Sequence, residues 1–313
     1  MRLLIVLCLT ALASVSISPS QAESVVILTG GTSGVYYPLG LALQKLFERE
    51  LPSVKTSVLS TQATVENLNL LQNGKGQLAL AQGDILTEAR KGSAEAGFPS
   101  SRAKIRLIGA AYPNFIHIIA RQDAKIHSAQ DLRGKRVSVG ASRSGNELNA
   151  RALLGAAGLS YADLAHVEYL EYGQSVDLMA ARGLDAAIIS AGLGVAAVKR
   201  AVSQMPITFV PVTSDLIDNT HGAFFSAKIP EHTYDSQDAE VPAAALNNFF
   251  VTSVDVSDDL VYRMTKAIFT NLSELRAAHS AAKLISIETA LTTQPIDLHS
   301  GAARYFRQTG ALH

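Results

Sequence analysis

The chain is poor in cysteine, tryptophan and aromatic residues generally. Among its 313 residues there is one cysteine and no tryptophan, and aromatic residues make up 6%. The single cysteine, Cys8, lies in an apolar N-terminal run. The rest of the chain can therefore form no disulfide, no cysteine nucleophile and no cysteine-ligated zinc site. Its core must hold by packing alone, which a chain of this length can achieve.

The sequence also lacks an excess of charge of either sign. It has 27 Lys and Arg residues against 27 Asp and Glu residues. This balance provides no basic face for nucleic acid or for an anionic membrane surface, so we expect no nucleic-acid partner. The eight histidines include no pair with metal-ligand spacing on one predicted helix, so we expect no metal and no cofactor.

The N-terminal residues 1–22 have the pattern of a secretory signal peptide. An apolar run over residues 3–13 follows Arg2, and Ser20-Gln21-Ala22 is a small-residue cleavage site. No later apolar run approaches the eighteen or so residues of a membrane helix. A signal peptide on a chain without disulfides favours a bacterial periplasm. We expect a periplasmic protein, secreted through cleavage after Ala22, that is a monomer.

One stretch, residues 25–51, organises the rest of the sequence. Residues 25–28 are apolar and suit a buried parallel strand, and residues 29–34 form a small glycine-rich loop. From Leu39 the apolar residues recur with helical spacing. A helix start offers free N–H groups and the positive end of the helix dipole, and glycines let the backbone approach an anion closely. We interpret the stretch as a site for a small anion, most simply a carboxylate; the alternative is a glycine turn that only closes a loop.

The same strand–loop–helix device recurs along the chain. Predicted strands at 54–60 and 78–81 alternate with helices at 65–72, capped by Thr64, and at 85–91. A second α/β unit begins near Ser128, with a second glycine–serine loop at 140–147. This order predicts an α/β fold with doubly wound parallel sheets. The further elements predicted are strands 105–111, 115–120, 137–139, 166–170, 185–190 and 207–210, an extended run 241–251 returning to the first domain, and helices 148–157, 175–182, 195–204, 257–278, 288–291 and 300–309.

A secreted α/β enzyme, for example a serine hydrolase, is the alternative class. It would need a Gly-x-Ser-x-Gly elbow after a strand, followed by an Asp and a His. Neither glycine–serine loop has this spacing. Two nucleotide-binding motifs are also absent. A dinucleotide fingerprint would need an acidic residue at the end of the second predicted strand, and a P-loop would need Gly-Lys-Ser/Thr after the first glycines. The sequence therefore predicts no enzyme and no catalytic residues.

Several motifs, in order, resemble the TAXI family, the extracytoplasmic solute receptors of one class of TRAP transporters. The resemblance covers essentially the whole mature chain. It is carried by Gly30-Gly-Thr-Ser-Gly-Val-Tyr-Tyr-Pro-Leu-Gly40, Val65-Glu-Asn-Leu-Asn-Leu-Leu71, Leu78-Ala-Leu-Ala-Gln-Gly-Asp84, Asp131-Leu-Arg-Gly-Lys-Arg-Val-Ser-Val-Gly140, Asp259-Leu-Val-Tyr262 and Pro295-Ile-Asp-Leu-His-Ser-Gly-Ala-Ala-Arg-Tyr305.

The resemblance implies a two-domain periplasmic-binding-protein fold of type II-like topology, with a ligand cleft between the domains. We expect residues 23–111 plus 252–313 to form domain 1 and residues 112–251, with the hinge crossings, to form domain 2. The resemblance further implies a small organic anion as ligand, similar to glutamate or 2-oxoglutarate, and TRAP transporter membrane subunits as partners. The chain departs from the family pattern at Ser33, where glycine is common, and at Ser142-Arg143, where Pro-Gly is common.

Open α/β sheets bind ligands at the ends of their strands, and this rule selects the candidate site residues. For Tyr36 a packing role at the domain edge is the alternative, and for Asp84 a helix N-cap. For Gln82 and Ser190 the alternatives are a polar loop residue and a cap of the next turn. The candidates are Thr32, Ser33, Gly34, Tyr36, Gln82 and Asp84 from the first domain, and Ser142, Arg143, Ser144, Gly145, Ser190 and Ala191 from the second.

Arg143 supports the sharpest hypothesis about the ligand. It precedes a helix predicted to start near Asn146. An arginine at that position could grip a carboxylate bidentately beside the free N–H groups of the helix, which would favour a dicarboxylate. The alternative places Arg143 at the solvent rim of the cleft, or in a pair with Glu147.

Overall fold

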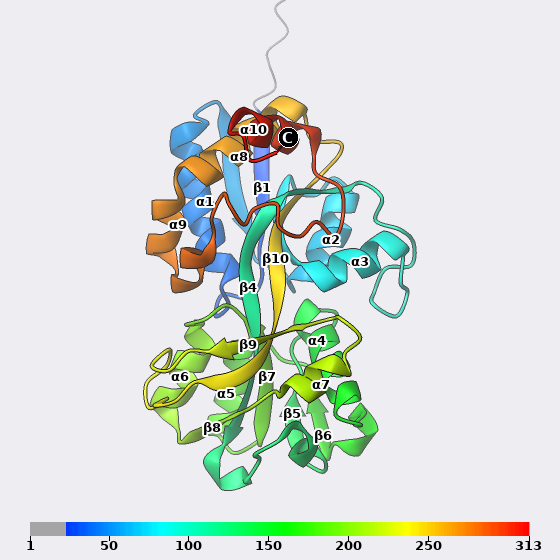
Figure 1. The fold of residues 1–313 in the computed structure, drawn as a ribbon, viewed down its shortest axis with the longest axis vertical. Coiled ribbons are helices and arrows are strands. Elements are labelled where there is room, and N and C mark those ends of the chain that lie inside the picture. The colour runs from blue at the N-terminus through cyan, green and yellow to red at the C-terminus, as the bar shows by residue number, and fades with distance from the viewer. Residues whose placement is uncertain (1–22, 313) are drawn as a thin grey trace, which may run out of the picture.

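The protein consists of two lobes stacked along its long axis, and two long strands pass through both of them (Figure 1). The computed structural model describes residues 23–312. The long strands are β4 (Ile105–Arg121) and β10 (Val241–Ser253), which run antiparallel to each other. The predicted signal peptide, residues 1–22, lies outside the described residues. Within residues 23–312, no helix has the length and apolar character to cross a bilayer.

The first lobe is built from the N-terminal βα units. Strand β1 pairs in parallel with β2 and β3, and β10 then joins β3 to β4, which gives the order β2-β1-β3-β10-β4. The elements are β1 (Glu23–Leu28), α1 (Tyr36–Glu50), β2 (Val54–Leu59), α2 (Thr64–Gln72), β3 (Leu78–Gln82) and α3 (Gly83–Lys91).

The second lobe repeats the same arrangement. Strand β5 pairs in parallel with β6 and β7, and β7 pairs with β4 in antiparallel orientation. In each lobe the second strand therefore lies at the outer edge of the sheet, next to the first strand. The third strand lies on the other side of the first, between it and the crossing strands β4 and β10. Its elements are β5 (Arg136–Ser138), α4 (Gly145–Ala156), β6 (His166–Glu168), α5 (Tyr172–Ala180), β7 (Ala186–Ala191), α6 (Ala196–Gln204), β8 (Ile207–Val210), α7 (Ser214–Asp218) and β9 (Phe225–Ile229), with 3-10 turns η1 (Gln122–Ala124), η2 (Ala129–Leu132) and η3 (Tyr161–Asp163). The predicted two-lobed α/β fold is confirmed.

After β10 the chain returns to the first lobe and ends in helices. Helix α8 (Asp258–Thr270) follows its N-cap Ser257, whose side chain accepts a hydrogen bond from the Leu260 N–H. Both α8 and α9 (Leu272–Ala278) pack against α1. The 3-10 turn η4 (Ser280–Leu284) and helix α10 (Ser300–Gln308) follow, and α10 packs on α8 and β4.

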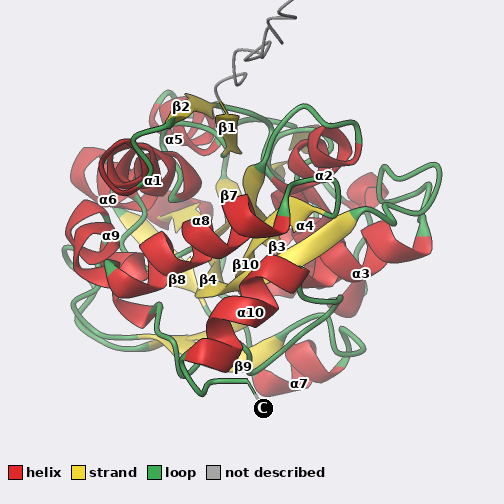
Figure 2. Cartoon of the chain, turned by 90° about the horizontal axis from the view of Figure 1, so that it is seen from above, coloured by secondary structure: helices red, strands yellow, loops and turns green. Residues whose placement is uncertain are grey.

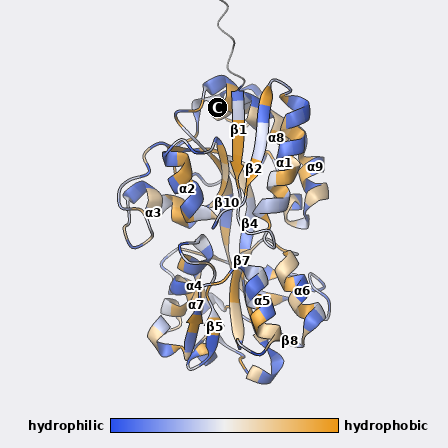
Figure 3. Cartoon of the chain, turned by 180° about the vertical axis from the view of Figure 1, so that it is seen from behind, coloured by the Kyte–Doolittle hydropathy of each residue, from blue (hydrophilic) through white to orange (hydrophobic). Residues whose placement is uncertain are grey.

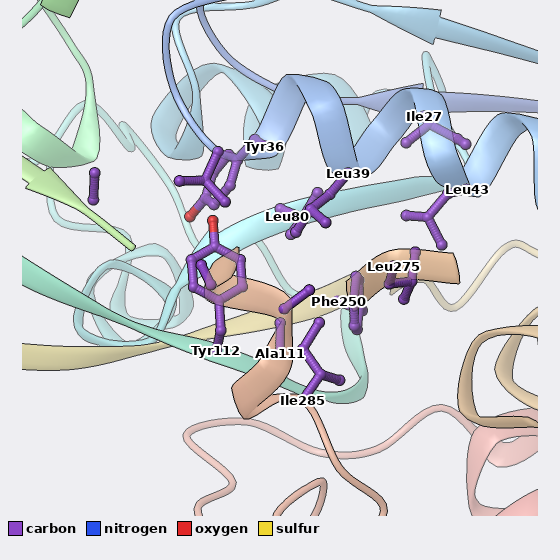
Figure 4. Packing of buried hydrophobic residues seen from close by; sticks show 14 of the residues in the cluster. Ile27, Tyr36, Leu39, Leu43, Leu80, Ala111, Tyr112, Phe250, Leu275 and Ile285 are labelled. Atoms are coloured by element: carbon purple, nitrogen blue, oxygen red, sulfur yellow. The ribbon is translucent and has the colours of Figure 1, made fainter. Parts of the chain in front are cut away.

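Helices cover both faces of the sheet, as the view from above shows (Figure 2). Strand β3 is buried along its whole length, because parallel strands covered on both faces meet no water. Hydropathy colouring places the apolar residues along the strands and the inward sides of the helices (Figure 3). Helix α1 contributes the fully buried Leu39 and Leu43, which pack towards Leu80 and Phe250 (Figure 4). The core therefore forms on either side of one continuous sheet.

The predicted break between strands 105–111 and 115–120 is wrong, because β4 continues without interruption. Pro113 fits extended backbone and lies opposite Asn247 of β10, beside an irregularity in the β10–β4 register. The Asn248 side chain bridges this irregularity. Its Nδ2 donates to the Tyr112 carbonyl oxygen at 2.9 Å and to Asn114 Oδ1 at 2.7 Å. A side-chain amide thus replaces part of the ladder where the strands pass between the lobes.

Several predicted helix limits are also corrected. Helix α1 begins at Tyr36, three residues before Leu39, because Pro38 then falls in the first turn, where a missing N–H costs nothing. Thr64 does not cap α2: it is the first helical residue, after Ala63. The single helix predicted to run from 257 to 278 is divided at Asn271 into α8 and α9.

The remaining differences concern irregular segments. Residues 220–239, which look polar and irregular, contain strand β9 on the edge of β10. The helix predicted at 288–291 is a turn. The domain limits at 111/112 and 251/252 stay a prediction, since both cuts fall inside strands that run through the two lobes.

His117 is a buried strand residue, as expected for its position in β4. It is 1% exposed, its Nδ1 lies 2.9 Å from the Phe115 carbonyl oxygen, and its Nε2 lies 2.8 Å from the Tyr234 hydroxyl. Burial lowers the pKa of His117 to about 4. The folded protein therefore holds this imidazole neutral.

We expect His117 to make the fold sensitive to acid. Because its pKa is lower in the folded than in the unfolded chain, its contribution is complete above about pH 6.5 and is lost as pH falls towards 4. Between pH 7.5 and 5 the loss should be about 2 kcal/mol of unfolding free energy. Urea unfolding of the wild type and of His117→Gln at both pH values measures it. An equal pH dependence in the two proteins would contradict the assignment.

Candidate functional site

A small cavity lies at the junction of the lobes, where strands end and helices begin. Its volume is about 60 Å³, which is room for on the order of four to six water molecules. It is lined by Gly30, Gly31, Gly34, Val35, Tyr36, Gln62, Ala63, Thr64 and Gln82 from the first lobe, by Tyr112 and Asn114 from β4, and by Ala141, Ser144, Gly145, Asn146, Glu171, Tyr172, Ser190 and Ala191 from the second lobe.

Helix starts from both lobes form part of the cavity wall. Helix α1 follows Val35, which provides no side-chain cap for it. Across the cavity, the Ser144 hydroxyl caps α4 by accepting a hydrogen bond from the Glu147 N–H at 3.1 Å, and Gly145 opens the helix. Both helices direct the positive ends of their dipoles and free N–H groups towards the cavity, which suits a negatively charged group.

Ser190, at the end of β7, is the centre of the hydrogen bonding between the lobes. Gln82 Nε2 of the first lobe donates to Ser190 Oγ at 3.1 Å. The Ser190 carbonyl oxygen accepts from Asn114 Nδ2 at 3.0 Å and from the Tyr172 hydroxyl at 2.7 Å. Asn146 holds the same strand end, since its side chain accepts from the Ser190 N–H. Ser190 therefore joins a strand, two helices and the opposite lobe.

The network extends from Asn114 back to α1. Asn248 Nδ2 donates to Asn114 Oδ1, and the Tyr36 hydroxyl donates to Asn248 Oδ1. The Tyr36 and Tyr112 rings meet edge to face, with centroids 6.4 Å apart, and their hydroxyl ends point towards one another (Figure 4). Burial raises the pKa of both tyrosines. Both hydroxyls therefore keep their protons and can donate at neutral pH.

Two buried polar atoms of the cavity wall lack a hydrogen-bond partner among the described residues. They are the Tyr112 hydroxyl and Gln82 Oε1. An unsatisfied buried polar atom costs about 1–3 kcal/mol, so such atoms usually await a ligand or a water. A solute with an acceptor for Tyr112 and a donor for Gln82 would remove both costs.

Glu171 is the one charged residue among the described residues that line the cavity. It forms a reciprocal capping box with Gln174 at the start of α5, and burial raises the pKa of its carboxyl. An added Cβ on Gly31 would clash with Glu171 Oε2, so the carboxylate packs directly against the glycine loop. Across residues 23–312 no group of three or more His, Cys, Asp and Glu residues could hold a metal ion.

Comparison with models of known protein families identifies the family of this chain. The model of the NMT1-like family matches residues 27–310, almost the whole described chain. The chain belongs to the NMT1-like family.

Solved structures share the fold of this NMT1-like protein at low sequence identity. PhnD1 of Prochlorococcus marinus, in complex with methylphosphonate, superposes with a TM-score of 0.61 at 10% identity, over 93% of this chain and 100% of that one. A protein of Bordetella bronchiseptica gives 0.54 at 15% identity, over 93% and 90%. A histidine kinase sensor domain with similarity to periplasmic binding proteins gives 0.50 at 15% identity, over 84% and 97%. The fold is therefore the two-lobed fold of periplasmic binding proteins.

The cavity of the NMT1-like protein contains part of the predicted site. Gln82 is the last residue of β3 and is 3% exposed, so its alternative role as a polar loop residue is wrong. The predicted residues that line the cavity are Gly34, Tyr36, Gln82, Ser144, Gly145, Ser190 and Ala191, and those that do not are Thr32, Ser33, Asp84, Ser142 and Arg143.

Ser33 and Asp84 hold the lobes together beside the cavity. The Gly173 N–H of the second lobe donates to Ser33 Oγ at 3.1 Å. Asn149 Nδ2 of α4 donates to Asp84 Oδ2 at 2.6 Å. The proposed N-cap role of Asp84 is wrong, because Gln82 precedes α3 and Asp84 lies within its first turn. These contacts show that the lobes are closed on one another.

Arg143 and Ser142 lie outside the cavity, in an exposed turn. They line a separate groove with Glu147, Arg151 and Tyr169. Arg143 has a φ of +58°, a conformation that favours glycine. The positive φ suits the glycine of the family pattern, and nothing in the structure explains the arginine that stands there in this chain. The suggested pair with Glu147 is also absent from the described contacts, since Glu147 pairs with Arg151 at 2.7 Å.

The sequence alone did not reveal five central residues of the site: Tyr112, Asn114, Asn146, Glu171 and Tyr172. Tyr112 and Asn114 flank Pro113, and a polar residue beside a proline within a strand is a sequence feature that could have identified them. Glu171 and Tyr172 follow a short edge strand, and nothing in their local pattern distinguishes them from an ordinary helix start. The register of β4 against β7 and β10 places Tyr112 and Asn114, while Asn146, Glu171 and Tyr172 enter the cavity wall from the starts of α4 and α5.

We expect a side chain at position 145 to oppose closure. An added Cβ there would clash with Gln82 Oε1 and lie 3.1 Å from Thr64 Oγ1, both on the opposite lobe. Gly145→Ala should therefore enlarge the radius of gyration, measured by small-angle scattering. Gly155→Ala, in the same helix, meets nothing within 4 Å and is the matched control; it should leave the radius unchanged. Equal radii for both variants and the wild type would refute the role of Gly145.

Proposed function

We propose that this protein is the periplasmic receptor of a TAXI-type TRAP transporter, capturing a small organic anion and delivering it to the membrane permease. Glutamate, 2-oxoglutarate and similar carboxylates are the solutes considered. The observation that carries the proposal is a cavity between two lobes whose wall contains two helix starts and the unpartnered hydroxyl of Tyr112.

The carboxylate of the solute would bind without a basic side chain. None of the described residues that line the cavity is a lysine, arginine or histidine. Free N–H groups at the starts of α1 and α4, together with the Tyr112 hydroxyl, would supply the hydrogen bonds. Each hydrogen bond to a charged group is worth about 1.5–3 kcal/mol, so a few of them suffice for micromolar affinity.

Glu171 favours a solute that also carries an ammonium group. Its carboxylate lines the cavity without a described cationic neighbour there. An ammonium group would neutralise this charge and lower the desolvation cost of Glu171. L-glutamate should consequently bind more tightly than 2-oxoglutarate, which differs by having a keto group in place of the amine.

The size of the cavity favours a compact solute. About 60 Å³ accommodates roughly four to six waters. Alanine or pyruvate would fit with little change, whereas glutamate or 2-oxoglutarate would require the walls to move apart. Hinge opening about β4 and β10 would provide that room.

The alternative of a secreted serine hydrolase lacks its chemistry. Ser144 is committed to capping α4, and no histidine lines the cavity within the described part of the chain. A hydrolase needs a base within hydrogen-bond reach of its nucleophile. A sensor domain is a second possible use of the same fold, as the histidine kinase relative shows for that protein. Three parts of the proposal are inferred from the sequence alone: the TRAP permease as partner, the periplasmic location and the monomeric state.

A solute panel tests the proposal. Mature protein is titrated by calorimetry with L-glutamate, L-alanine, 2-oxoglutarate, pyruvate and, as a neutral control, glucose. At a hundred times its dissociation constant, a bound carboxylate should add about 2.7 kcal/mol to the unfolding free energy. Glu171→Gln should reduce the preference for amino acids over keto acids. Binding of glucose but of no carboxylate would reject the anion assignment, and ester turnover without binding would favour the hydrolase.

Tyr112→Phe isolates one contact of the site. The hydroxyl has no partner among the described residues, so its removal should not lower the stability of the solute-free protein. Affinity for a bound carboxylate should fall roughly ten- to a hundredfold, the value of one hydrogen bond to a charged group of about 1.5–3 kcal/mol. Tyr234→Phe is the matched control, since its hydroxyl bonds His117 away from the cavity; it should lower stability and leave affinity unchanged. The opposite pattern would place Tyr112 outside the binding site.

A further inference from the structure

Asp84 and Asn149 form a hydrogen-bonded pair across the lobe junction, outside the cavity. Asp84 belongs to the first turn of α3 in the first lobe, and Asn149 to α4 in the second. Asn149 Nδ2 donates to Asp84 Oδ2 at 2.6 Å, and Asn149 is 1% exposed. Closing the lobes is therefore what brings this carboxyl and this amide together.

The second oxygen of each group has no donor. Asp84 Oδ1 and Asn149 Oδ1 are both buried and without a hydrogen-bond partner among the described residues. An ionised carboxylate can only accept, so it cannot satisfy the amide oxygen, whereas a carboxylic acid carries one O–H donor. A single proton on Asp84 would thus supply the donor that this pair lacks.

We propose that lobe closure takes up one proton from solvent at Asp84, which then pairs with Asn149 as a neutral acid–amide couple. The inference rests on the proposed receptor function, because a captured solute would shift the lobes from open forms to the closed form described here. The proton binds to the carboxylate when the lobes meet and returns to water when they part. Capture is consequently tighter at lower pH.

The charged neighbours of Asp84 are of both signs. Arg151 of α4 is positively charged and is paired with Glu147. Tyr36 of α1 carries no charge, because burial raises its pKa and its hydroxyl stays protonated. The ionisable residues that share the groove at Asp84 are Glu88 and Lys91 of α3, Glu95 of the following loop, Arg151 of α4 and His221 of the 220–223 loop.

Burial raises the pKa of Asp84 to about 7, and the charge of Glu88 acts in the same direction, while hydrogen bonds from Ile85 and Asn149 oppose it. Parting the lobes would return Asp84 to water and to an ordinary pKa near 4. A group whose pKa is higher in the closed state favours closure below that pKa, and this advantage is lost as pH rises through about 7. The sensitive window therefore lies between about pH 6 and 8.

The test measures affinity for L-glutamate, L-alanine and pyruvate, whose charges stay constant between pH 6 and 8. Wild-type affinity for whichever of the three binds should be about tenfold higher at pH 6 than at pH 8, as one proton predicts. Calorimetry in two buffers of different ionisation enthalpy should register proton uptake on binding. Asp84→Asn keeps the hydrogen bonding with Asn149 but carries no titrating proton, so its affinity should be equal at both pH values.

Two control variants separate Asp84 from its neighbours. Glu88→Gln and His221→Gln remove the nearby titrating groups and should retain the wild-type pH dependence. The inference is overturned if Asp84→Asn keeps the tenfold difference, if the wild type shows none, or if His221→Gln abolishes it.

A failure of the receptor function would give a different result. If none of the three solutes binds at either pH, the solute assignment is wrong. The protonation of Asp84 is then tested by thermal unfolding without solute. The lobes of the solute-free structure are closed and Asp84 contacts Asn149, so the melting temperature of Asp84→Asn relative to wild type should rise between pH 6 and 8, because only the wild type is then forced to bury a charge. An unchanged difference in melting temperature would overturn the inference independently.

Discussion

The two lobes depend on a pair of strands that belong to both. Because β4 and β10 run through the junction side by side, neither lobe can slide or twist freely against the other, and bending of these strands is the motion left to them. Their register is irregular between Asn247 and Val251, where the Asn248 amide bonds Tyr112 and Asn114. A ladder held partly by a side chain can bend there without losing a whole row of backbone hydrogen bonds.

The same pair of strands positions the binding chemistry. Tyr112 and Asn114 lie on β4 between the lobes, and both line the cavity. Gln82 ends β3 and Ser190 lies near the end of β7, and the two side chains are hydrogen-bonded across the junction although β10 and β4 separate their strands in the sheet. The wall is thus a set of neutral donors and acceptors fixed by main-chain register, with the carboxylate of Glu171 as its charge. A neutral wall stabilises a carboxylate through oriented dipoles, at a smaller desolvation cost than a buried ion pair.

Closure is held by few polar contacts. Across the junction Gln82 meets Ser190, Ser33 meets Gly173, and Asp84 meets Asn149. Arg151 also meets Glu95, and Ser280 meets Leu193. Each neutral hydrogen bond contributes about 0.5–1.5 kcal/mol, and buried oxygens left without donors offset part of that gain. A solute that satisfies Tyr112 and Gln82 can therefore shift the equilibrium between open and closed forms, since a few kcal/mol suffices for a large change in population.

The sequence by itself determined the class of fold, the repeated strand–loop–helix device and the two loops that meet at the cavity. These features are local: apolar runs, helical spacing and glycines are readable within about twenty residues, and they selected Tyr36, Gln82, Ser144, Gly145 and Ser190, which line the cavity in the structure. Only the tertiary structure decided which neighbouring residue faces inward. Arg143 and Gly145 are two residues apart, yet one lies in an exposed turn with positive φ and the other against Gln82 of the opposite lobe. Tyr112 and Glu171 enter the site through strand register and lobe closure, which join residues far apart in the chain, and no local pattern carries that information.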